Sequence, residues 1–447
     1  MKSFDQLLME ATQSVEEELK IEDKGWITLG GGGVIITEAA RIANVNQSRL
    51  YYAKDPLGKQ AIRLWTDYTF GGGMTWQSEE DATKKALSSF WDSPKNQPIL
   101  SAQGQRKSSN KLLVEGEIFF AIFLGEETVI RLINPLQITE IISNPDDEED
   151  VRFYRRAWTN AQGKAKTAIY RSVMNPKGEA TLDASGNSVS QTEDALVYHL
   201  AYNTIEQRGN PLLLPALDWI KQYRRFLASR VAIMLALARF AWRSKVKGGQ
   251  ASVDAVKAKT NDQEIAAASH LIENLGVDTQ PIKADSGASN AYQDGRMLKL
   301  QVAAAVGIPE QYFGDISIGN LATAKTVELP MMKMFQSYQK VWSDTYQNIN
   351  NIVLEHAGVA PDKWAVDIDF PPIAPADAIA VADAISKVAT VMPAIADSRD
   401  VQQMVLLALG INNTAAVLDA MHESNPNVSL IKALRGFKES LEKKEEK

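Results

Sequence analysis

The pattern of hydrophobic and polar residues changes along the chain. Residues 46–116 carry apolar residues at helical spacing, as in Ile62, Trp65 and Tyr68, which lie on one face of a predicted helix. Residues 117–200 instead contain short apolar runs, such as EIFFAIFLG and ETVIRLINP, which predict β-strands. A helical part is therefore followed by a β-rich part, in which an acidic turn joins two of the strands.

The most regular apolar pattern runs over residues 212–241. A continuous helix over this range would be about 45 Å long. Its apolar core, 226–242, contains two arginines and is shorter than the ~20 residues that a membrane helix needs, so we expect a packed helix. Apolar residues recur at heptad spacing in two seams, the second of which is broken at Arg224, and the predicted packing residues among them are Leu213, Ile220, Leu227, Val231 and Met234.

Shorter elements follow this helix. Residues 243–288 are small and polar, and five Lys or Arg stand against one Asp between 243 and 259. A second long helix is predicted over 289–306, and a glycine-punctuated segment then leads into a third that ends near His356. Pro330 should kink this third helix or mark its true start, because proline cannot continue the backbone hydrogen bonds of a helix.

The two ends of the chain differ from the middle. Residues 1–45 look like an arm, in which the four glycines at 30–33 fit a flexible link better than a phosphate-binding loop, because the lysine and spacing of such a loop are absent. Residues 364–370 alternate as a strand does, and 376–441 predict short alanine-rich helices. The predicted fold class is α+β, mainly α-helical.

Composition excludes several kinds of chemistry. The 447 residues include no cysteine and four histidines that are not at metal-ligand spacing, so we expect no thiolate zinc site, no cysteine nucleophile, no metal and no cofactor. The net charge of −7 argues against a basic nucleic-acid coat protein. No nucleophile motif, zinc-protease motif or phosphate loop occurs, so we predict no catalytic residues and no enzyme activity.

One arrangement keeps an enzyme open as an alternative. Asp367 and Asp369 alternate on the predicted strand and face the same side, where they could bind a metal as part of an unrecognised hydrolase site. A solvent-facing pair is the commoner outcome for such a pattern. ATP hydrolysis by the purified protein would favour this enzyme alternative.

Three features together resemble the portal proteins of tailed bacteriophages. The first is the strand-to-helix junction 201–242, with Arg208-Gly209-Asn210-Pro211-Leu212 leading into the long helix. The second is RMLKLQVAAAVGIPEQYFGD, a helix that ends in a Gly-Ile-Pro turn. The third is the loop ISIGNLATAK, which continues directly into a long aromatic-lined helix. The resemblance covers about residues 46–372 as an order of elements, with no invariant catalytic signature.

The resemblance implies a ring, usually of twelve copies, at one capsid vertex. Through this channel double-stranded DNA would be packaged and later ejected. The subunit would divide into an N-terminal arm (1–45), a wing (46–205), a first stem helix (206–242), a clip (243–288), a second stem helix (289–308), a tunnel loop (309–326), a long wing helix and strand (327–372), and a helical crown and tail (373–447).

The resemblance also implies roles for named residues. The tunnel loop would contact DNA through Ile316, Ile318, Asn320, Leu321 and Lys325. The stem packing residues would meet neighbouring copies, although they could equally pack within one subunit. The clip would face the packaging motor or adaptors, and its basic residues would meet an acidic protein surface, meet DNA, or serve only solubility: Arg243, Lys245, Lys247, Lys257 and Lys259.

The implied partners are other copies of the chain, the terminase large subunit, the major capsid and scaffolding proteins, neck or adaptor proteins, and DNA bound without sequence preference. The implied location is the portal vertex of the virion, after assembly in the host cytoplasm, with no membrane contact. A different ring-forming virion protein, structural or adaptor, is an alternative, as is a membrane pore supported only by the amphipathic 226–242 segment; liposome binding would distinguish the pore.

Overall fold

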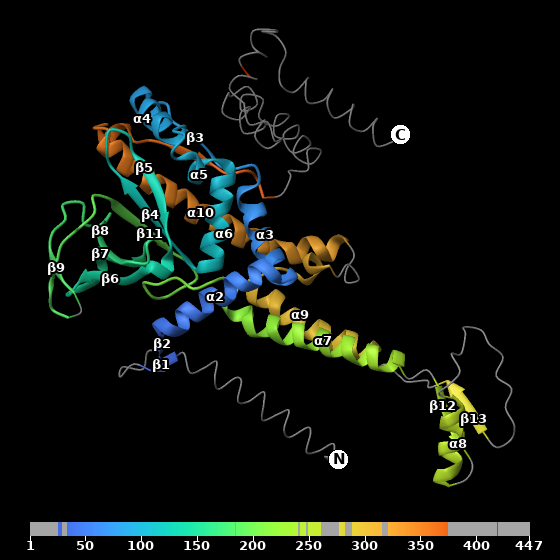
Figure 1. Cartoon of the computed structure of the whole chain (residues 1–447). Helices are drawn as coiled ribbons and strands as arrows, with labels where there is room; N and C mark the ends of the chain where they lie inside the picture. The colour runs from blue at the N-terminus through green and yellow to red at the C-terminus, as the bar shows by residue number, and fades with distance from the viewer. Residues whose placement is uncertain are drawn as a thin grey trace, which may run out of the picture. The chain divides into compact units, whose positions relative to one another are not determined.

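The computed structural model shows a mixed α+β protein whose chain divides into two compact units (Figure 1). Unit 1 is made of residues 1–45, 61–211 and 319–447, and unit 2 of residues 46–60 and 212–318. The residues that the structure describes are 26–28, 34–183, 185–239, 242–246, 249–260, 277–281, 288–314, 321–373 and 418.

A six-stranded sheet forms the β-rich part of unit 1, in the order β5-β4-β11-β8-β7-β6. Neighbouring strands are antiparallel except β11 and β8, which are parallel. The predicted strand pair with an acidic turn is the β6–β7 hairpin. The strands are β4 Glu117–Phe123, β5 Val129–Ile133, β6 Ile138–Asn144, β7 Asp147–Thr159, β8 Ala165–Ser172 and β11 Leu196–Ala201.

Short strand pairs accompany the sheet in unit 1. The described residues form three such antiparallel pairs, one of which joins residues almost 300 positions apart in the sequence. They are β1 Trp26–Thr28 with β2 Val34–Ile36, β3 Thr75–Gln77 with β14 Asp367–Asp369, and β9 Thr181–Leu182 with β10 Ser188–Val189.

The predicted helices between residues 46 and 116 are present, with one difference. The first helix, α2, already begins at Glu38, inside the predicted arm, because the Thr37 hydroxyl accepts a hydrogen bond from the Ala40 N–H and caps it. The chain crosses from unit 1 to unit 2 within α2 and back within α3. These helices are α2 Glu38–Lys54, α3 Pro56–Phe70, α4 Asp81–Trp91, α5 Gln97–Leu100 and α6 Ala102–Glu115.

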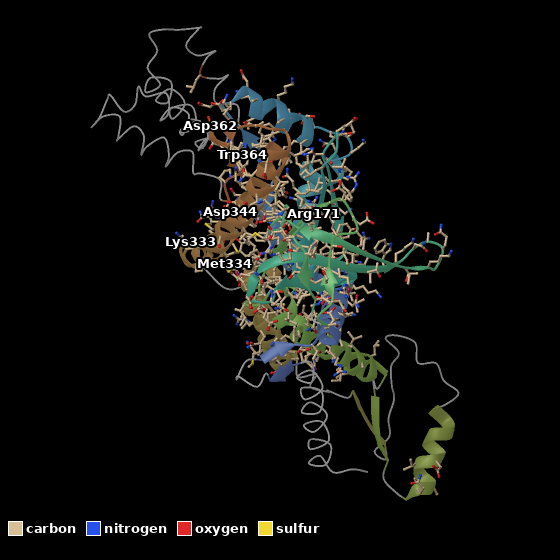
Figure 2. All side chains as sticks on the ribbon, turned by 90° about the vertical axis from the view of Figure 1, so that its left-hand side faces the viewer. Arg171, Lys333, Met334, Asp344, Asp362 and Trp364 are labelled. Carbon is tan, nitrogen blue, oxygen red and sulfur yellow. The ribbon has the colours of Figure 1, made fainter. Side chains whose placement is uncertain are left out.

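The aromatic face predicted for the third long helix is the core of unit 1. The helix is α10, Leu321–His356, and Phe335, Tyr338 and Trp342 are almost completely buried on it. The ring of Trp65 from α3 meets the rings of Phe335 and Tyr338 edge to face, at centroid distances of 5.2 and 5.4 Å. Figure 2 shows Lys333, Asp344 and then Trp364 following one another along this side of unit 1.

Of the two outcomes predicted for Pro330, the structure excludes the helix start, because α10 begins at Leu321 and contains Pro330 in its interior; the kink stays a prediction. The predicted strand over 364–370 is shorter, because only Asp367–Asp369 pair with β3, and a 3-10 turn, η4 Pro361–Lys363, lies just before it. Of the predicted helices over 376–441, all but Leu418 lies outside the described residues.

Unit 2 contains two long helices that pack against each other. They are α7, Leu217–Arg239, and α9, Ala288–Val306. Helix α9 matches its predicted range closely, whereas α7 begins five residues later than predicted, because the 3-10 turn η2, Leu214–Ala216, precedes it. The helices approach closely at Gly295, where a Cβ atom would come within 2.8 Å of the Phe226 ring. The segment between them includes β12 Trp242–Val246, α8 Gln250–Thr260 and β13 Val277–Pro281, and β12 pairs antiparallel with β13.

Candidate assembly surface and the buried Glu117 cluster

The predicted seam of the first long helix has two different halves. Leu213 and Ile220 are completely buried, so these two residues belong to the chain's own core. Further along α7 the same face carries Leu227, Val231 and Met234, whose exposures are 44, 55 and 60%. The apolar face therefore continues beyond the point where the single chain covers it, because residues at i, i+7, i+11 and i+14 share one side of a helix.

Helix α9 has an exposed apolar side as well. Val302 and Val306 are buried, whereas Met297 and Leu300, about half a turn away around the helix, are exposed. Scattered surface hydrophobics are ordinary, but a group of them on two packed helices is typical of a protein–protein contact. We call this group the stem patch, and its members are Leu227, Val231, Met234 and Leu235 of α7 with Met297 and Leu300 of α9.

Ion pairs hold the segment that follows α9 in unit 2. Glu310 opens the 3-10 turn η3, Glu310–Phe313, and is nearly buried. The Arg296 guanidinium donates to its carboxylate at 3.0 and 3.2 Å, and the Lys299 ammonium lies 3.7 Å away. The chain that enters the predicted tunnel loop is thus fixed at its start.

The predicted loop and clip residues are only partly described. Ile316, Ile318, Asn320 and Lys247 lie outside the described residues. Leu321 and Lys325 stand in the first turns of α10 rather than in a loop. The other clip residues lie on two elements of unit 2, with Arg243 and Lys245 on β12 and Lys257 and Lys259 on α8. The roles of all these side chains stay predictions.

A buried carboxylate in unit 1 gathers four hydrogen-bond donors. Glu117 is completely buried at the start of β4. Its oxygens accept from Arg208 at 2.6 and 3.1 Å, from Arg41 at 3.2 Å and from His199 Nε2 at 3.1 Å. The Gly209 N–H lies 3.4 Å from the same carboxylate. A buried charge is tolerated only with such partners, so the cluster is fully compensated.

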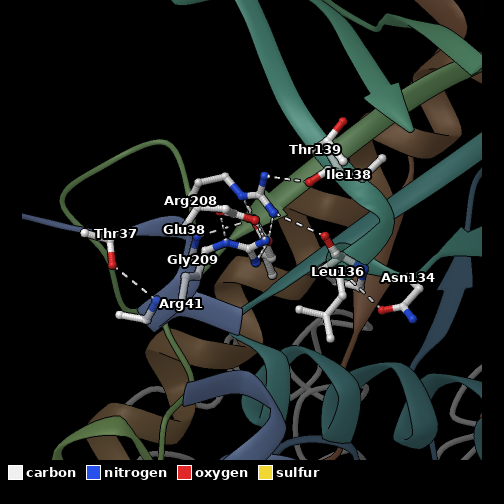
Figure 3. Close-up of polar contacts among 12 residues, drawn as sticks. Thr37, Glu38, Arg41, Asn134, Leu136, Ile138, Thr139, Arg208 and Gly209 are labelled. Atoms are coloured by element: carbon white, nitrogen blue, oxygen red, sulfur yellow. Dashed lines mark hydrogen bonds and ion pairs between the residues drawn. The ribbon is translucent and has the colours of Figure 1, made fainter. Parts of the chain in front are cut away.

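Strand register places these side chains together. Glu117 and Phe119 share one face of β4, and His199 lies opposite Phe119 on β11, with their rings stacked 4.1 Å apart. Arg41 comes from α2, where Glu38 also binds it. Arg208 comes from the loop after β11 and also donates to the carbonyl of Ile138, as Figure 3 shows.

The surroundings keep the carboxylate ionised. Burial by itself would raise the pKa of Glu117, but the hydrogen bond from His199 and the charge of Arg208 outweigh it and lower the pKa below its ordinary value. Burial would likewise lower the pKa of Arg41, but its contacts with Glu38 and Glu117 raise it. The cluster is therefore held together by charge at neutral pH.

The lowered pKa of Glu117 predicts a loss of stability in acid. The unfolded carboxyl titrates near pH ~4.3, so the contribution of Glu117 is complete above that value and is lost as the pH falls through the lower folded pKa. The free energy of unfolding in urea should fall more steeply between pH 5 and pH 3 for the wild type than for Glu117→Gln. Equal slopes for the two proteins would contradict this linkage.

No local pattern in the sequence predicts this cluster. Its one signal is Glu117 itself, which is the only charged residue in the apolar strand EIFFAIF. Its partners stand 76, 82 and 91 positions away in the sequence, and no local pattern connects them. In the sequence, Arg208 and Gly209 belong only to the strand-to-helix junction that resembles portal proteins.

The carboxylate pair of the alternative enzyme lies on β14, with both side chains exposed. Burial, together with Asp367, raises the pKa of Asp369, and the Gln77 amide lies 3.4 Å from its carboxylate. In the part of the chain that the structure describes, no group of three or more His, Cys, Asp or Glu could hold a metal. Within the same residues, no helix combines the length and apolar character of a membrane span.

Comparison with known proteins gives similarity in structure alone. Neither models of protein families nor curated proteins match the chain. Among solved structures, a chain from the neck of an empty gene transfer agent (GTA) particle, computed with C6 symmetry, is 13% identical with a TM-score of 0.51. The match covers 82% of this chain and 93% of that one.

A chain from the virion of a native GTA particle is also 13% identical, over the same shares of the two chains, with a TM-score of 0.47. The identities are low, so the likeness concerns the fold. The match to the neck chain extends over most of both chains. The predicted resemblance is confirmed at this level: the chain has a phage portal-like fold, shared with a component of the neck of a virion-like particle.

Proposed function

We propose that the chain is a structural subunit of a closed ring at the head–tail junction of a phage or phage-like particle. The observation that carries this proposal is the stem patch, where the core face of α7 continues as exposed Leu227, Val231 and Met234. Exposed apolar area of this kind is stabilised when another copy covers it. A ring needs such heterologous contacts to repeat around its axis.

The portal-like fold supports a ring of twelve copies. The similar neck structure was computed with C6 symmetry, and a twelve-membered ring contains a six-fold axis. In this proposal 206–242 and 289–308 form the stem, 243–288 the clip, 309–326 the tunnel loop, and 373–447 the crown. The remaining segments, 46–205 and 327–372, form the wing, and 1–45 an arm.

The proposed role is DNA passage rather than catalysis. Double-stranded DNA would be packaged through the ring by a terminase motor that binds the clip, and would later be ejected toward neck or adaptor proteins. Each Lys or Arg that pairs with a phosphate adds salt-dependent affinity, which would resist sliding. The net charge of −7 suits a channel that binds DNA weakly.

The tunnel loop offers a direct test of DNA contact. We expect a variant carrying Ile318→Asp and Lys325→Glu to package DNA poorly, because two acidic side chains in each copy would repel the phosphates. A packaging assay with purified motor and capsids measures this. The matched control carries Ala161→Asp and Lys164→Glu, which make the same charge changes on the exposed β7–β8 turn. Normal packaging by the acidic variant would remove 316–325 from the DNA path.

Electron microscopy of the purified protein tests the proposed function itself. Negatively stained samples should contain ring-shaped particles with a central hole wide enough for a DNA duplex. A protein that stays a single compact particle under every assembly condition would contradict the ring. ATP hydrolysis or binding to liposomes would instead favour the enzyme or the membrane pore.

A further inference from the structure

The loop that joins β11 to the first long helix is closed at its base. The Tyr202 N–H donates to the Gly116 carbonyl at 2.8 Å, and the Asn210 N–H donates to the Tyr202 carbonyl at 3.0 Å. Gly209 lies so close that a Cβ atom there would be 1.9 Å from the Gly116 oxygen. Gly116 has a positive φ of 83°, which favours glycine. The backbones at the base therefore touch directly.

Two long side chains, those of Gln207 and Arg208, fix the second half of this loop. Arg208 binds Glu117 and also donates to the carbonyls of Ile138 and Pro135, at 3.1 and 3.2 Å. The Gln207 amide donates to the Ser143 hydroxyl at 3.0 Å and to the Glu148 carbonyl at 2.6 Å. The buried Glu117 cluster thus holds a surface loop as well as the core. A buried ion cluster contributes more to a unique conformation than to net stability, which suits this role.

The tip of the loop is ordered and displays one apolar side chain. Among the described residues, Asn203 is the only non-glycine with a positive φ, 54°, and its amide donates to the Pro211 carbonyl. The Thr204 hydroxyl accepts from the Glu206 N–H at 2.9 Å. Between them Ile205 has a relative exposure of 102%, so no part of its side chain is covered.

We propose that residues 203–207 are a rigid docking element and that Ile205 inserts into the apolar surface of an adjacent copy of this chain. The loop is already held in one conformation, so little ordering entropy is lost when Ile205 is buried. Thr204 and Glu206 give it the polar rim that surrounds apolar anchors at interfaces.

The surface that receives Ile205 belongs to a second copy of the chain, because this inference rests on the proposed ring. In a closed ring each copy offers one surface to a different surface of the next copy, so a projecting element needs no matching element on its own face. The loop also ends at Pro211, directly before the segment that leads into α7 and the stem patch. The loop is thus adjacent in sequence to the segment that carries the proposed ring contact.

A photo-crosslinking amino acid at position 205 tests the contact. Ile205→benzoylphenylalanine in assembled rings should give covalent dimers on irradiation. The same substitution at Ala161, which is exposed on the β7–β8 turn, serves as the control and should give few. Rings without dimers at 205, or crosslinks only within one chain, would overturn the inference.

A charge at the same position provides an independent measurement. Ile205→Asp should raise the protein concentration needed for half-maximal ring assembly about 10- to 100-fold, because an aspartate cannot be buried against an apolar surface. Ile205→Val should change it by less than about fivefold. The midpoint of thermal unfolding should stay the same, because Ile205 is fully exposed in the single chain.

A failure of the docking role can be distinguished from a failure of the proposed ring. If the wild type forms rings and Ile205→Asp assembles as well as Ala161→Asp does, the docking role of Ile205 is wrong and the proposed ring stands. If the wild type forms no rings at all, both the ring and the docking role are contradicted.

Discussion

Replacing Glu117 with alanine is expected to lower the free energy of unfolding by about 3–5 kcal/mol. The substitution leaves the buried Arg41 guanidinium and the partly buried Arg208 without their shared carboxylate, and removal of one partner from a buried ion cluster costs about this much. Urea denaturation followed by tryptophan fluorescence measures the change, because the buried Trp65 and Trp342 report on unit 1.

The matched control is Glu127→Ala. Glu127 also binds a lysine, Lys95, but both side chains are about half exposed, and an exposed pair contributes little to stability. Glu117→Gln should fall between the two variants, because the amide still accepts a hydrogen bond but carries no charge. Similar losses for Glu117→Ala and Glu127→Ala would show that the cluster does not organise the fold of unit 1.

Aspartates at Val231 and Met234 are expected to abolish ring assembly at concentrations where the wild type assembles fully. Each of these side chains would contribute roughly 1.5–3 kcal/mol when buried by a neighbouring copy, and a charge in its place reverses that gain. The double variant should therefore need at least 100-fold more protein to assemble. Analytical ultracentrifugation over a concentration series measures this.

The subunit itself should not be affected by these aspartates. Both side chains are more than half exposed in the single chain, so the circular dichroism and the thermal midpoint of the dissociated protein should stay within about 2 °C of the wild type. Ser229→Asp places the same charge on the opposite side of α7 and should assemble normally. Full assembly of the double variant would place the subunit interface elsewhere.

Local patterns in the sequence predicted much of the fold. The aromatic face of α10 and the limits of α9 follow from helical periodicity, and β4 and β11 from short apolar runs. These features are set by residues within one or two turns of one another. The order of these elements was also enough to predict the portal-like fold.

Other features depend on residues far apart in the sequence. The pattern could not divide the α7 seam into a buried half and an exposed half, because Leu213 and Ile220, which are buried, and Leu227 and Met234, which are exposed, repeat at the same spacing. It could not join Arg41, His199 and Arg208 at Glu117, because they lie far from it in the sequence. The exposure of Ile205 depends on how the loop after β11 is held, which only tertiary contacts determine.

The mass of the assembled protein tests the central claim most directly. Native mass spectrometry of the purified chain should show one closed species near 590 kDa, which is twelve times the 49.2 kDa of the subunit, with no open series of intermediate masses. The double aspartate variant at Val231 and Met234 should appear at the mass of one subunit. A wild-type protein that remains at 49.2 kDa at every concentration and salt condition would contradict the ring.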